Sequence, residues 1–307
     1  MSDPYKKVFI IGNGFDLDLG MKTRYSDFAK SDQWPFENSI LALAGHLNNR
    51  SKIDKWLDLE SELLIYAQNT KSSYQEGDQR AFVNLVNQLT LYLKTEEQKK
   101  LRTDSVAAQV LAAIIENGYF ESIYSFNYTD LHGIASKLGI PTEFSYEHVH
   151  GSIKDNTLIL GIEEQSDVKQ GYEFLYKTFS SYYESHSIQY DLQEANEVVF
   201  FGHSLGHNDY HYFQTFFQMQ CLEYMSRKDS KRITIFTYDD TSRIEILKQL
   251  RNMNDKKTAL LFNQNKMEII CTNGGGEKRL TDFLKRMKEE SVVKDNREVR
   301  TFESQIY

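Results

Sequence analysis

The sequence has few cysteines, no excess of basic residues and no apolar run of membrane-spanning length. Its two cysteines, Cys221 and Cys271, lie far apart in a chain of 307 residues, so neither a zinc ribbon nor a disulfide framework is predicted. The 44 acidic residues outnumber the 36 basic ones and give a formal charge of −8. Broad nucleic-acid binding is therefore not expected, because it requires a basic surface that displaces counterions.

The beginning of the chain and its hydropathy predict a soluble cytoplasmic protein without membrane contact. A buried strand is expected from residue 8, which leaves no room for a signal peptide. The hydrophobic fraction of 40% is typical of globular proteins. The length suits one large α/β domain over residues 1–307, and a charged, mobile tail is expected over 289–307.

A short apolar run that ends in two glycines is the clearest pattern in the chain. Val8 to Ile11 are all apolar, as in a strand whose two faces are both covered. Gly12 and Gly14 follow, and they would let backbone N–H groups approach an anion such as a pyrophosphate. A dinucleotide fingerprint would place a third glycine at position 17, where this chain has Leu17. The pattern therefore predicts either a nucleotide-binding turn or simply a tight turn.

The remaining periodicity predicts an α/β fold with a mostly parallel sheet and helices on both faces. Residues 23–118 contain four helical stripes and little that resembles a strand. Because that length is too great for one crossover connection, we predict a large helical insertion. Helices are also expected over 243–250 and 280–288. Further strands are predicted over 120–126, 147–153, 157–162, 198–201, 232–238 and 267–272.

Small or polar residues follow several of the predicted strands. Asn127 and His150 stand just past two of them, and Gly202, His203 and Ser204 follow a third. Ligands of open parallel sheets bind beyond the carboxyl ends of the strands, so we expect the functional site there. An asparagine amide can orient a water, and a neutral imidazole can accept a proton. A helix cap and a structural histidine are the alternative interpretations of Asn127 and His150.

Two other kinds of site are not favoured. The run from Gly202 to Gly206 matches the nucleophile elbow of serine hydrolases, but no histidine follows a candidate acid in the required order. A turn facing phosphate or ribose is favoured instead, with Asp209 accepting a ribose hydroxyl. The histidines 203, 207 and 211 would share a face only on a helix, and a loop is expected between them. No metal site is predicted.

Several short motifs, in this order, resemble the AbiH family, which is associated with bacteriophage abortive infection. The motifs are Gly12-Asn13-Gly14-Phe15-Asp16, Trp56-x-Asp58-x-Glu60, Ser125-Phe126-Asn127-Tyr128-Thr129, His148-Val149-His150-Gly151-Ser152 and Gly202-His203-Ser204-Leu205-Gly206-x-x-Asp209. The same order is similar to the wider SIR2-like group of Rossmann-like (SIR2/DHS-like) domains. Several defence members of that group destroy NAD.

The resemblance also implies roles for individual residues. Asn127 would order the attacking water or hold the nicotinamide ribose, and His150 would act as a general base. The positions implied to contact the nucleotide are Gly12, Asn13 and Gly14 at the pyrophosphate, Asp16 near the ribose, Gly151 after the histidine, and Gly202, Ser204 and Asp209 on the adenosine side. The chain lacks the cysteine zinc module of sirtuin deacylases, so protein deacylation is not expected. Thr129 stands where sirtuins carry an acid, and this departure leaves the detailed mechanism open.

The leading hypothesis is a defence protein that binds NAD and, when triggered, hydrolyses its nicotinamide–ribose bond. NAD or a related nucleotide would be its substrate or ligand, and no prosthetic group is expected. The alternative is a nucleotide-binding sensor without turnover, whose helical insertion contacts a second copy or a partner defence protein. A nuclease or other hydrolase is a third possibility, and the negative charge counts against it.

Overall fold

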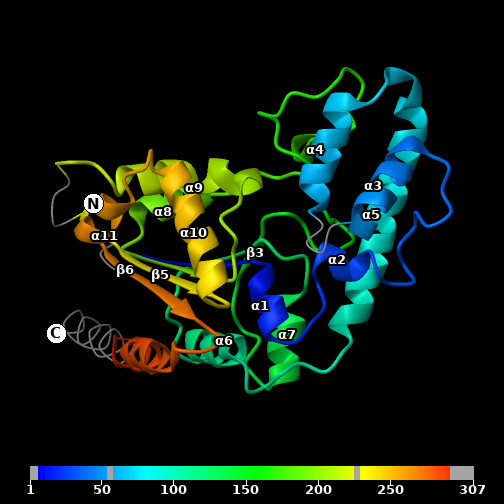
Figure 1. Cartoon of the computed structure of the whole chain (residues 1–307). Coiled ribbons are helices and arrows are strands. Elements are labelled where there is room, and N and C mark those ends of the chain that lie inside the picture. The colour runs from blue at the N-terminus through cyan, green and yellow to red at the C-terminus, as the bar shows by residue number, and fades with distance from the viewer. Residues whose placement is uncertain (1–5, 54–57, 225–228, 291–307) are drawn as a thin grey trace, which may run out of the picture.

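A six-stranded, all-parallel sheet with helices on both faces forms the centre of the molecule (Figure 1). The computed structural model describes residues 6–53, 58–224 and 229–290. The strands, in the spatial order β3-β2-β1-β4-β5-β6, are β1 (Lys7–Ile11), β2 (Ser122–Ser125), β3 (Glu147–His148), β4 (Glu197–Phe201), β5 (Arg232–Thr237) and β6 (Lys266–Cys271). The predicted α/β class with a parallel sheet is confirmed.

The helices divide into those that cover the sheet and those between β1 and β2. Their bounds are α1 (Asn13–Asp18), α2 (Tyr25–Phe28), α3 (Ala42–Ile53), α4 (Leu59–Asn69), α5 (Gln75–Glu97), α6 (Val106–Glu116), α7 (Leu131–Leu138), α8 (Ile188–Glu194), α9 (Tyr210–Met219), α10 (Asp240–Met253) and α11 (Thr258–Gln264). Short 3₁₀ turns are η1 (Ser72–Tyr74), η2 (Glu173–Leu175), η3 (Lys177–Phe179) and η4 (His207–Asp209). Residues 277–290 form a further helix.

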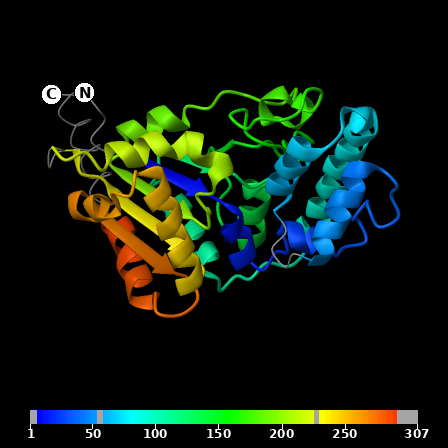
Figure 2. The same cartoon turned by 45° about the horizontal axis from the view of Figure 1, so that its top comes forward.

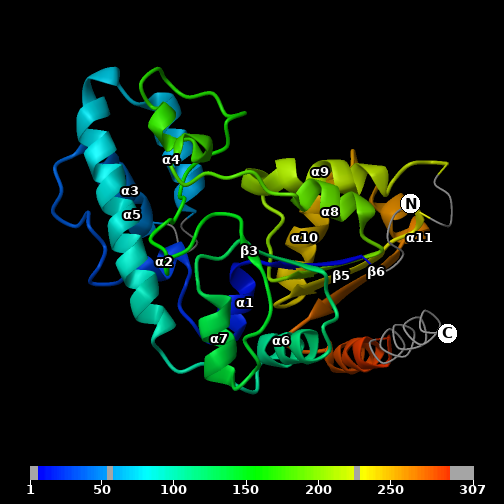
Figure 3. The same cartoon turned by 180° about the vertical axis from the view of Figure 1, so that it is seen from behind.

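Both faces of the sheet are buried, which explains the apolar runs of its central strands. Successive side chains of a strand point to opposite faces, so β1 supplies Val8 and Ile10 to one core and Phe9 and Ile11 to the other. Helices α8 to α11 cover the first face. Helices α1, α6, α7 and the 277–290 helix cover the second, and Figures 1 and 3 show the two helical layers.

Helices α2 to α5 stand beyond the carboxyl ends of the strands (Figures 1 and 2). They have a core of their own, in which Phe28, Leu47, Leu63 and Leu85 are buried. Helix α6 packs instead against the sheet with the second core. The predicted helical insertion covered residues 23–118. Only its part up to the end of α5 stands apart from the sheet. We call helices α2 to α5 the helical insertion.

The predicted strand over 157–162 was wrong. Its backbone does not join the ladder, and only Ile162 forms an isolated bridge, to Tyr176. Leu158, Leu160 and Ile162 are buried against the helical insertion, so packing on helices produced an apolar run that imitates a strand. The predicted strand over 147–153 shortens to the two residues of β3. Trp56 and the tail from residue 291 lie outside the described residues.

The order of the strands places the first glycine turn at the centre of the sheet. Strands β1 and β4 are neighbours, and the chain proceeds from them toward opposite edges. This strand order is that of dinucleotide-binding doubly wound sheets, whose ligands bind at such a switch point. None of the helices in the described ranges is long and apolar enough to cross a membrane.

Candidate functional site

The turns after β1 and β4 are in direct contact at the switch point. Gly12 N donates to Phe201 O over 2.9 Å, and Gly14 N donates to Gly202 O over 2.8 Å. A Cβ on Gly14 would lie 2.6 Å from Gly202 Cα, so the glycines allow the two loops to approach closely. Both N–H groups are thus already bonded within the chain, and pyrophosphate binding at this turn stays a prediction.

Asn127 lies directly against the first glycine turn. Its Nδ2 donates to Gly12 O over 3.1 Å and to Asp16 Oδ1 over 2.8 Å. The Thr129 hydroxyl donates to the other oxygen of Asp16 over 2.9 Å. Burial raises the pKa of Asp16 to about 7, although the hydrogen bonds from Thr129 and Asn127 oppose the rise. Thr129 therefore supports a buried carboxyl group on α1.

Asn13 is exposed and is held by the segment that follows α1. Its Oδ1 accepts a hydrogen bond from the Thr23 hydroxyl at 2.5 Å, and its Nδ2 donates to Thr23 O at 3.4 Å. These contacts orient the side chain of Asn13 at the entrance to the helical insertion. The predicted contact of Asn13 with a nucleotide stays untested.

His150 lies past the end of β3, in a turn that requires the glycine after it. Gly151 has φ +73°, and a Cβ there would lie 1.9 Å from Thr157 O. His150 is 5% exposed, and burial, together with the charge of Lys177, lowers its pKa to about 4. The imidazole is therefore neutral at pH 7.

The hydrogen bonds of His150 determine which nitrogen carries its proton. Nε2 lies 3.0 Å from Asp209 Oδ1, and because an ionised carboxylate only accepts, Nε2 donates. Nδ1 is left as a basic nitrogen, buried and without a hydrogen-bond partner among the described residues. An oriented imidazole with a free basic nitrogen is the arrangement that general-base catalysis uses.

Asp209 also joins His150 to a second histidine. His203 Nε2 lies 3.5 Å from Asp209 Oδ2, and His203 Nδ1 accepts from Leu205 N. The ring of Phe126 contacts both imidazoles edge-on, with centroids 4.5 Å from His203 and 5.3 Å from His150. Since Phe126 N donates to Ile11 O, this ring connects the histidines to the end of β1.

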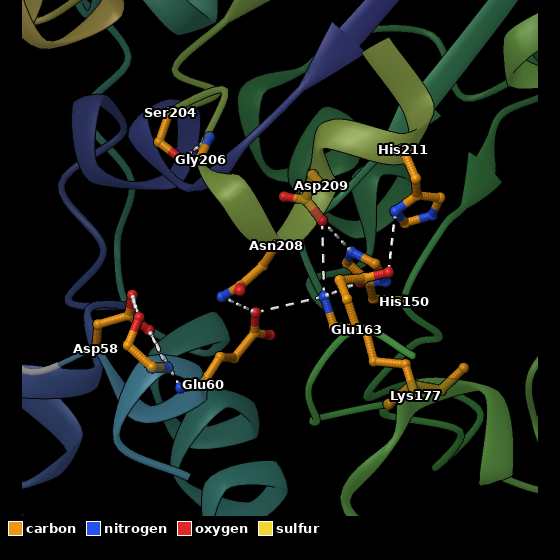
Figure 4. Close-up of polar contacts among 12 residues, drawn as sticks. Asp58, Glu60, His150, Glu163, Lys177, Ser204, Gly206, Asn208, Asp209 and His211 are labelled. Atoms are coloured by element: carbon orange, nitrogen blue, oxygen red, sulfur yellow. Dashed lines mark hydrogen bonds and ion pairs between the residues drawn. The ribbon is translucent and has the colours of Figure 1, made fainter. Parts of the chain in front are cut away.

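A buried lysine stands at the centre of the remaining polar side chains (Figure 4). Lys177 Nζ lies 3.3 Å from Glu60 Oε2, 3.4 Å from Glu163 Oε1 and 3.6 Å from Asp209 Oδ1. We call these four residues the Lys177 cluster. Burial would lower the pKa of Lys177, but the three carboxylates raise it well above its usual value. The ammonium therefore stays charged.

The acids of the Lys177 cluster differ in their readiness to lose a proton. Burial would raise the pKa of Asp209, but Lys177 and the bonded imidazoles hold it well below its usual range. Burial raises the pKa of Glu60 to about 7 against the opposing charge of Lys177. Such a divergence between neighbouring groups is characteristic of acid–base sites.

Ser204, His207 and His211 do not form a catalytic arrangement like that of His150 and Asp209. The hydroxyl of Ser204 is exposed and accepts from Gly206 N, so its hydrogen bond stays within its own loop. His207 stacks on Tyr210, and His211 Nδ1 lies 2.9 Å from Glu163 Oε2. Within the described ranges, no group of three or more histidine, cysteine or acidic side chains has a geometry that could hold a metal ion.

Residues 8–227 match the family described as bacteriophage abortive infection AbiH. The chain belongs to the AbiH family. The match extends over most of the sequence and includes every motif on which the resemblance was based. It gives no evidence of a relation to SIR2-like domains, so that wider resemblance stays a hypothesis. No curated protein matches this AbiH protein.

The fold of this AbiH protein brings the predicted residues into two adjoining groups. Asn127 and Asp16 meet at the first glycine turn, whereas His150 meets Asp209, a member of the Lys177 cluster. Sequence reasoning missed Lys177 and Glu163, which follow the predicted strand over 157–162. It included Glu60 only as part of a motif. That motif was the one available signal, because nothing local marks Lys177 or Glu163.

Proposed function

We propose that this abortive-infection protein binds NAD at the carboxyl edge of its sheet and hydrolyses the nicotinamide–ribose bond during infection. The observation that carries the proposal is the state of His150. Its Nε2 is bonded to Asp209, while its buried Nδ1 has no partner among the described residues. An imidazole in this state can take a proton from a water that attacks the ribose.

Asn127 would position that water. Both N–H bonds of its amide are directed at Gly12 O and the Asp16 carboxyl group, so the side-chain oxygen faces the other way. A water that donates to this oxygen keeps a lone pair for attack on C1′. The location supports a nucleotide as substrate, since doubly wound sheets bind nucleotides at the switch point between strands such as β1 and β4.

The reaction requires no oxidant and no metal ion to balance. The bond between C1′ and the nicotinamide nitrogen breaks, and the electron pair leaves with nicotinamide, which becomes neutral. Water forms the new C1′–O bond and gives its proton to His150 Nδ1. The products are nicotinamide, ADP-ribose and a proton, which His150 passes to solvent.

The test is nicotinamide release from NAD, measured by chromatography with the purified full chain, alone and with extract from infected cells. We expect release by the wild type and loss of release in His150→Ala. His207→Ala is the matched control, because His207 is exposed and its ring stacks on Tyr210, away from Asp209. Equal release by both variants would refute the role of His150. Binding of NAD without release in either condition would favour the alternative, a nucleotide-binding sensor.

A further inference from the structure

The Asp58/Glu60 motif has a structural role at the start of α4. Asp58 caps the helix, since its Oδ1 accepts from Glu60 N at 3.1 Å and from Ser61 N at 3.2 Å. The cap fixes the first turn, in which Glu60 is 9% exposed. A carboxylate in a first turn is stabilised by the helix dipole, but solvent normally surrounds it. The burial of Glu60 therefore calls for an explanation.

Glu60 connects the helical insertion to the residues of the candidate active site. Asn208, next to Asp209, donates its Nδ2 to Glu60 Oε2 over 2.8 Å. Lys177 Nζ reaches the same oxygen at 3.3 Å and is itself 3.6 Å from Asp209 Oδ1. The ammonium of Lys177 thus lies between Glu60 and Asp209, the carboxylate that binds His150.

Unsatisfied polar atoms are concentrated in and around the Lys177 cluster. Lys177 is 3% exposed, and its Nζ points at three carboxylates without a hydrogen bond of acceptable geometry among the described residues. Three more buried atoms also lack a hydrogen-bond partner among the described residues: Glu163 Oε1, His211 Nδ1 and His150 Nδ1. His211 nevertheless lies within ion-pair distance of Glu163. Buried polar groups are normally satisfied, so this concentration indicates a place that a ligand completes.

The charges indicate which kind of ligand would fit. Three carboxylates face one lysine, and Lys177 is almost fully buried. The carboxylates lie nearer to solvent, because the side chains of Glu60, Glu163 and Asp209 are 11%, 12% and 18% exposed. The cluster therefore has three carboxylates against one ammonium, and the ammonium lies deepest, so the site favours a cation.

We propose that Glu60, contributed by the helical insertion, completes the active site, and that the Lys177 cluster receives the positively charged nicotinamide riboside end of NAD. This inference rests on the proposed function. The Glu60 carboxylate then stabilises the positive charge that moves from the nicotinamide ring to the ribose as the C1′–N bond breaks. His150, bonded to Asp209 of the same cluster, accepts the proton of the water.

Such a role requires the ionised form of Glu60. Burial raises its pKa to about 7, so the ionised fraction grows as the pH rises through that value. The groups that face Glu60 are Lys177 and Asp209, Asp58 at the start of its own helix, and the phenols of Tyr25 and Tyr128. Burial raises the pKa of both phenols, so the two remain neutral in this range.

The test compares Glu60→Gln with Glu62→Gln in the purified full chain. Glu62 is the matched control, because it is a buried glutamate of the same helix whose partners, His46 and Arg50, lie within the insertion. We expect Glu60→Gln to lower kcat for NAD about 100-fold and Glu62→Gln to leave it within about threefold. The wild type should show a rise in kcat/KM through pH 7 that Glu60→Gln lacks.

A thermal-shift measurement with two probes separates this inference from the proposed function. Nicotinamide riboside, a cation, should stabilise the wild type and Glu62→Gln but not Glu60→Gln, whereas ADP-ribose should stabilise all three. Stabilisation by the cation without NAD hydrolysis would support the subsite and overturn the hydrolysis. NAD hydrolysis with equal kcat and equal cation binding in Glu60→Gln would overturn the subsite alone. If the wild type neither binds the cation nor hydrolyses NAD, both proposals fall.

Discussion

The amide of Asn127 donates to the Asp16 carboxyl group over 2.8 Å, although 111 positions separate the two residues. This bond ties the loop after β2 to the first helix after β1. With the bond from the same amide to Gly12 O, it holds the carboxyl ends of two neighbouring strands in a single arrangement. The rigidity of the edge from which the candidate site is built therefore depends on Asn127.

Replacing Asn127 should weaken the fold in a way that depends on charge. Asn127→Ala removes the amide donor of Gly12 O and of Asp16 Oδ1, so we expect a loss of about 1–3 kcal/mol in the free energy of unfolding. Asn127→Asp places a second carboxyl group beside Asp16, and two such groups cannot both ionise easily. Its stability, measured by urea unfolding, should fall more between pH 5 and pH 8 than that of the wild type. If Asn127→Ala unfolded at the same urea concentration as the wild type, the hydrogen bonds of Asn127 would not stabilise the fold.

The raised pKa of Asp16 should make stability fall as the pH rises. The folded protein keeps the Asp16 proton up to a pKa of about 7, whereas the unfolded chain releases it near the ordinary aspartate pKa of 3.8. Between these values the folded state binds more protons, so stability declines, by on the order of 4 kcal/mol in full, and levels off above pH 7.

Asp16→Asn tests this pH dependence, because the variant is nearly isosteric and cannot ionise. Thermal unfolding between pH 4 and pH 8 should show a smaller decline than in the wild type. Asp282→Asn, at an exposed position of the last described helix, should keep the wild-type decline. Parallel curves for the wild type and Asp16→Asn would show that Asp16 is ionised throughout.

His150 should make stability rise with pH, in a lower pH range than Asp16. Its pKa is about 4 in the folded protein and near the ordinary histidine value of 6.5 when unfolded. Between these values the unfolded chain binds the extra proton, so the contribution of His150 to stability is lost as the pH falls from 6.5 to 4. NMR spectra of the His150 imidazole should show no titration between pH 5 and pH 8. A midpoint near 6.5 would contradict the neutral state on which the proposed mechanism depends.

Asp209→Asn should leave the protein folded but impair its chemistry. The amide can still bond His150, yet it no longer selects the tautomer with a free Nδ1 or pairs with Lys177. We expect the rate of nicotinamide release to fall about 1,000-fold or more. Circular dichroism would confirm that the fold persists. Unchanged turnover would exclude a part for the His150–Asp209 pair.

The contact between the two glycine turns should tolerate no side chain. Gly202 has φ +66°, and a Cβ there would lie 2.4 Å from Phe15 N. We expect Gly202→Ala to lower the free energy of unfolding by about 3 kcal/mol or more, or to prevent folding. Gly45→Ala is the control, since no atom lies within 4 Å of a Cβ at that helical position. Its stability should stay the same or increase.

The central strands could be predicted from the sequence because both of their faces are buried. Val8 to Ile11 and Val198 to Phe201 form apolar runs that end in glycine, and they lie side by side in the sheet. The same rule failed at residues 157–162, where the partner that buries the run is the helical insertion rather than a strand. A buried segment has an apolar run in its sequence whether a strand or a helix covers it.

Part of the candidate site could be predicted for a related reason. Asn127, His150 and Asp209 follow or adjoin strand ends, so the topology of a parallel sheet brings them to one edge. Lys177 and Glu163 come to the same edge through the fold of a long irregular segment, which no local periodicity describes. Their role emerged only from distances between residues far apart in the chain, such as Lys177 and Glu60.

The most direct test of the central claim is the NAD content of bacteria during phage infection. Cells that carry the wild-type protein should lose NAD and gain nicotinamide after infection, before new phage are released. Cells with His150→Ala should keep their NAD and lose protection, whereas cells with His207→Ala should resemble the wild type. Protection by the wild-type protein with NAD unchanged would contradict the account.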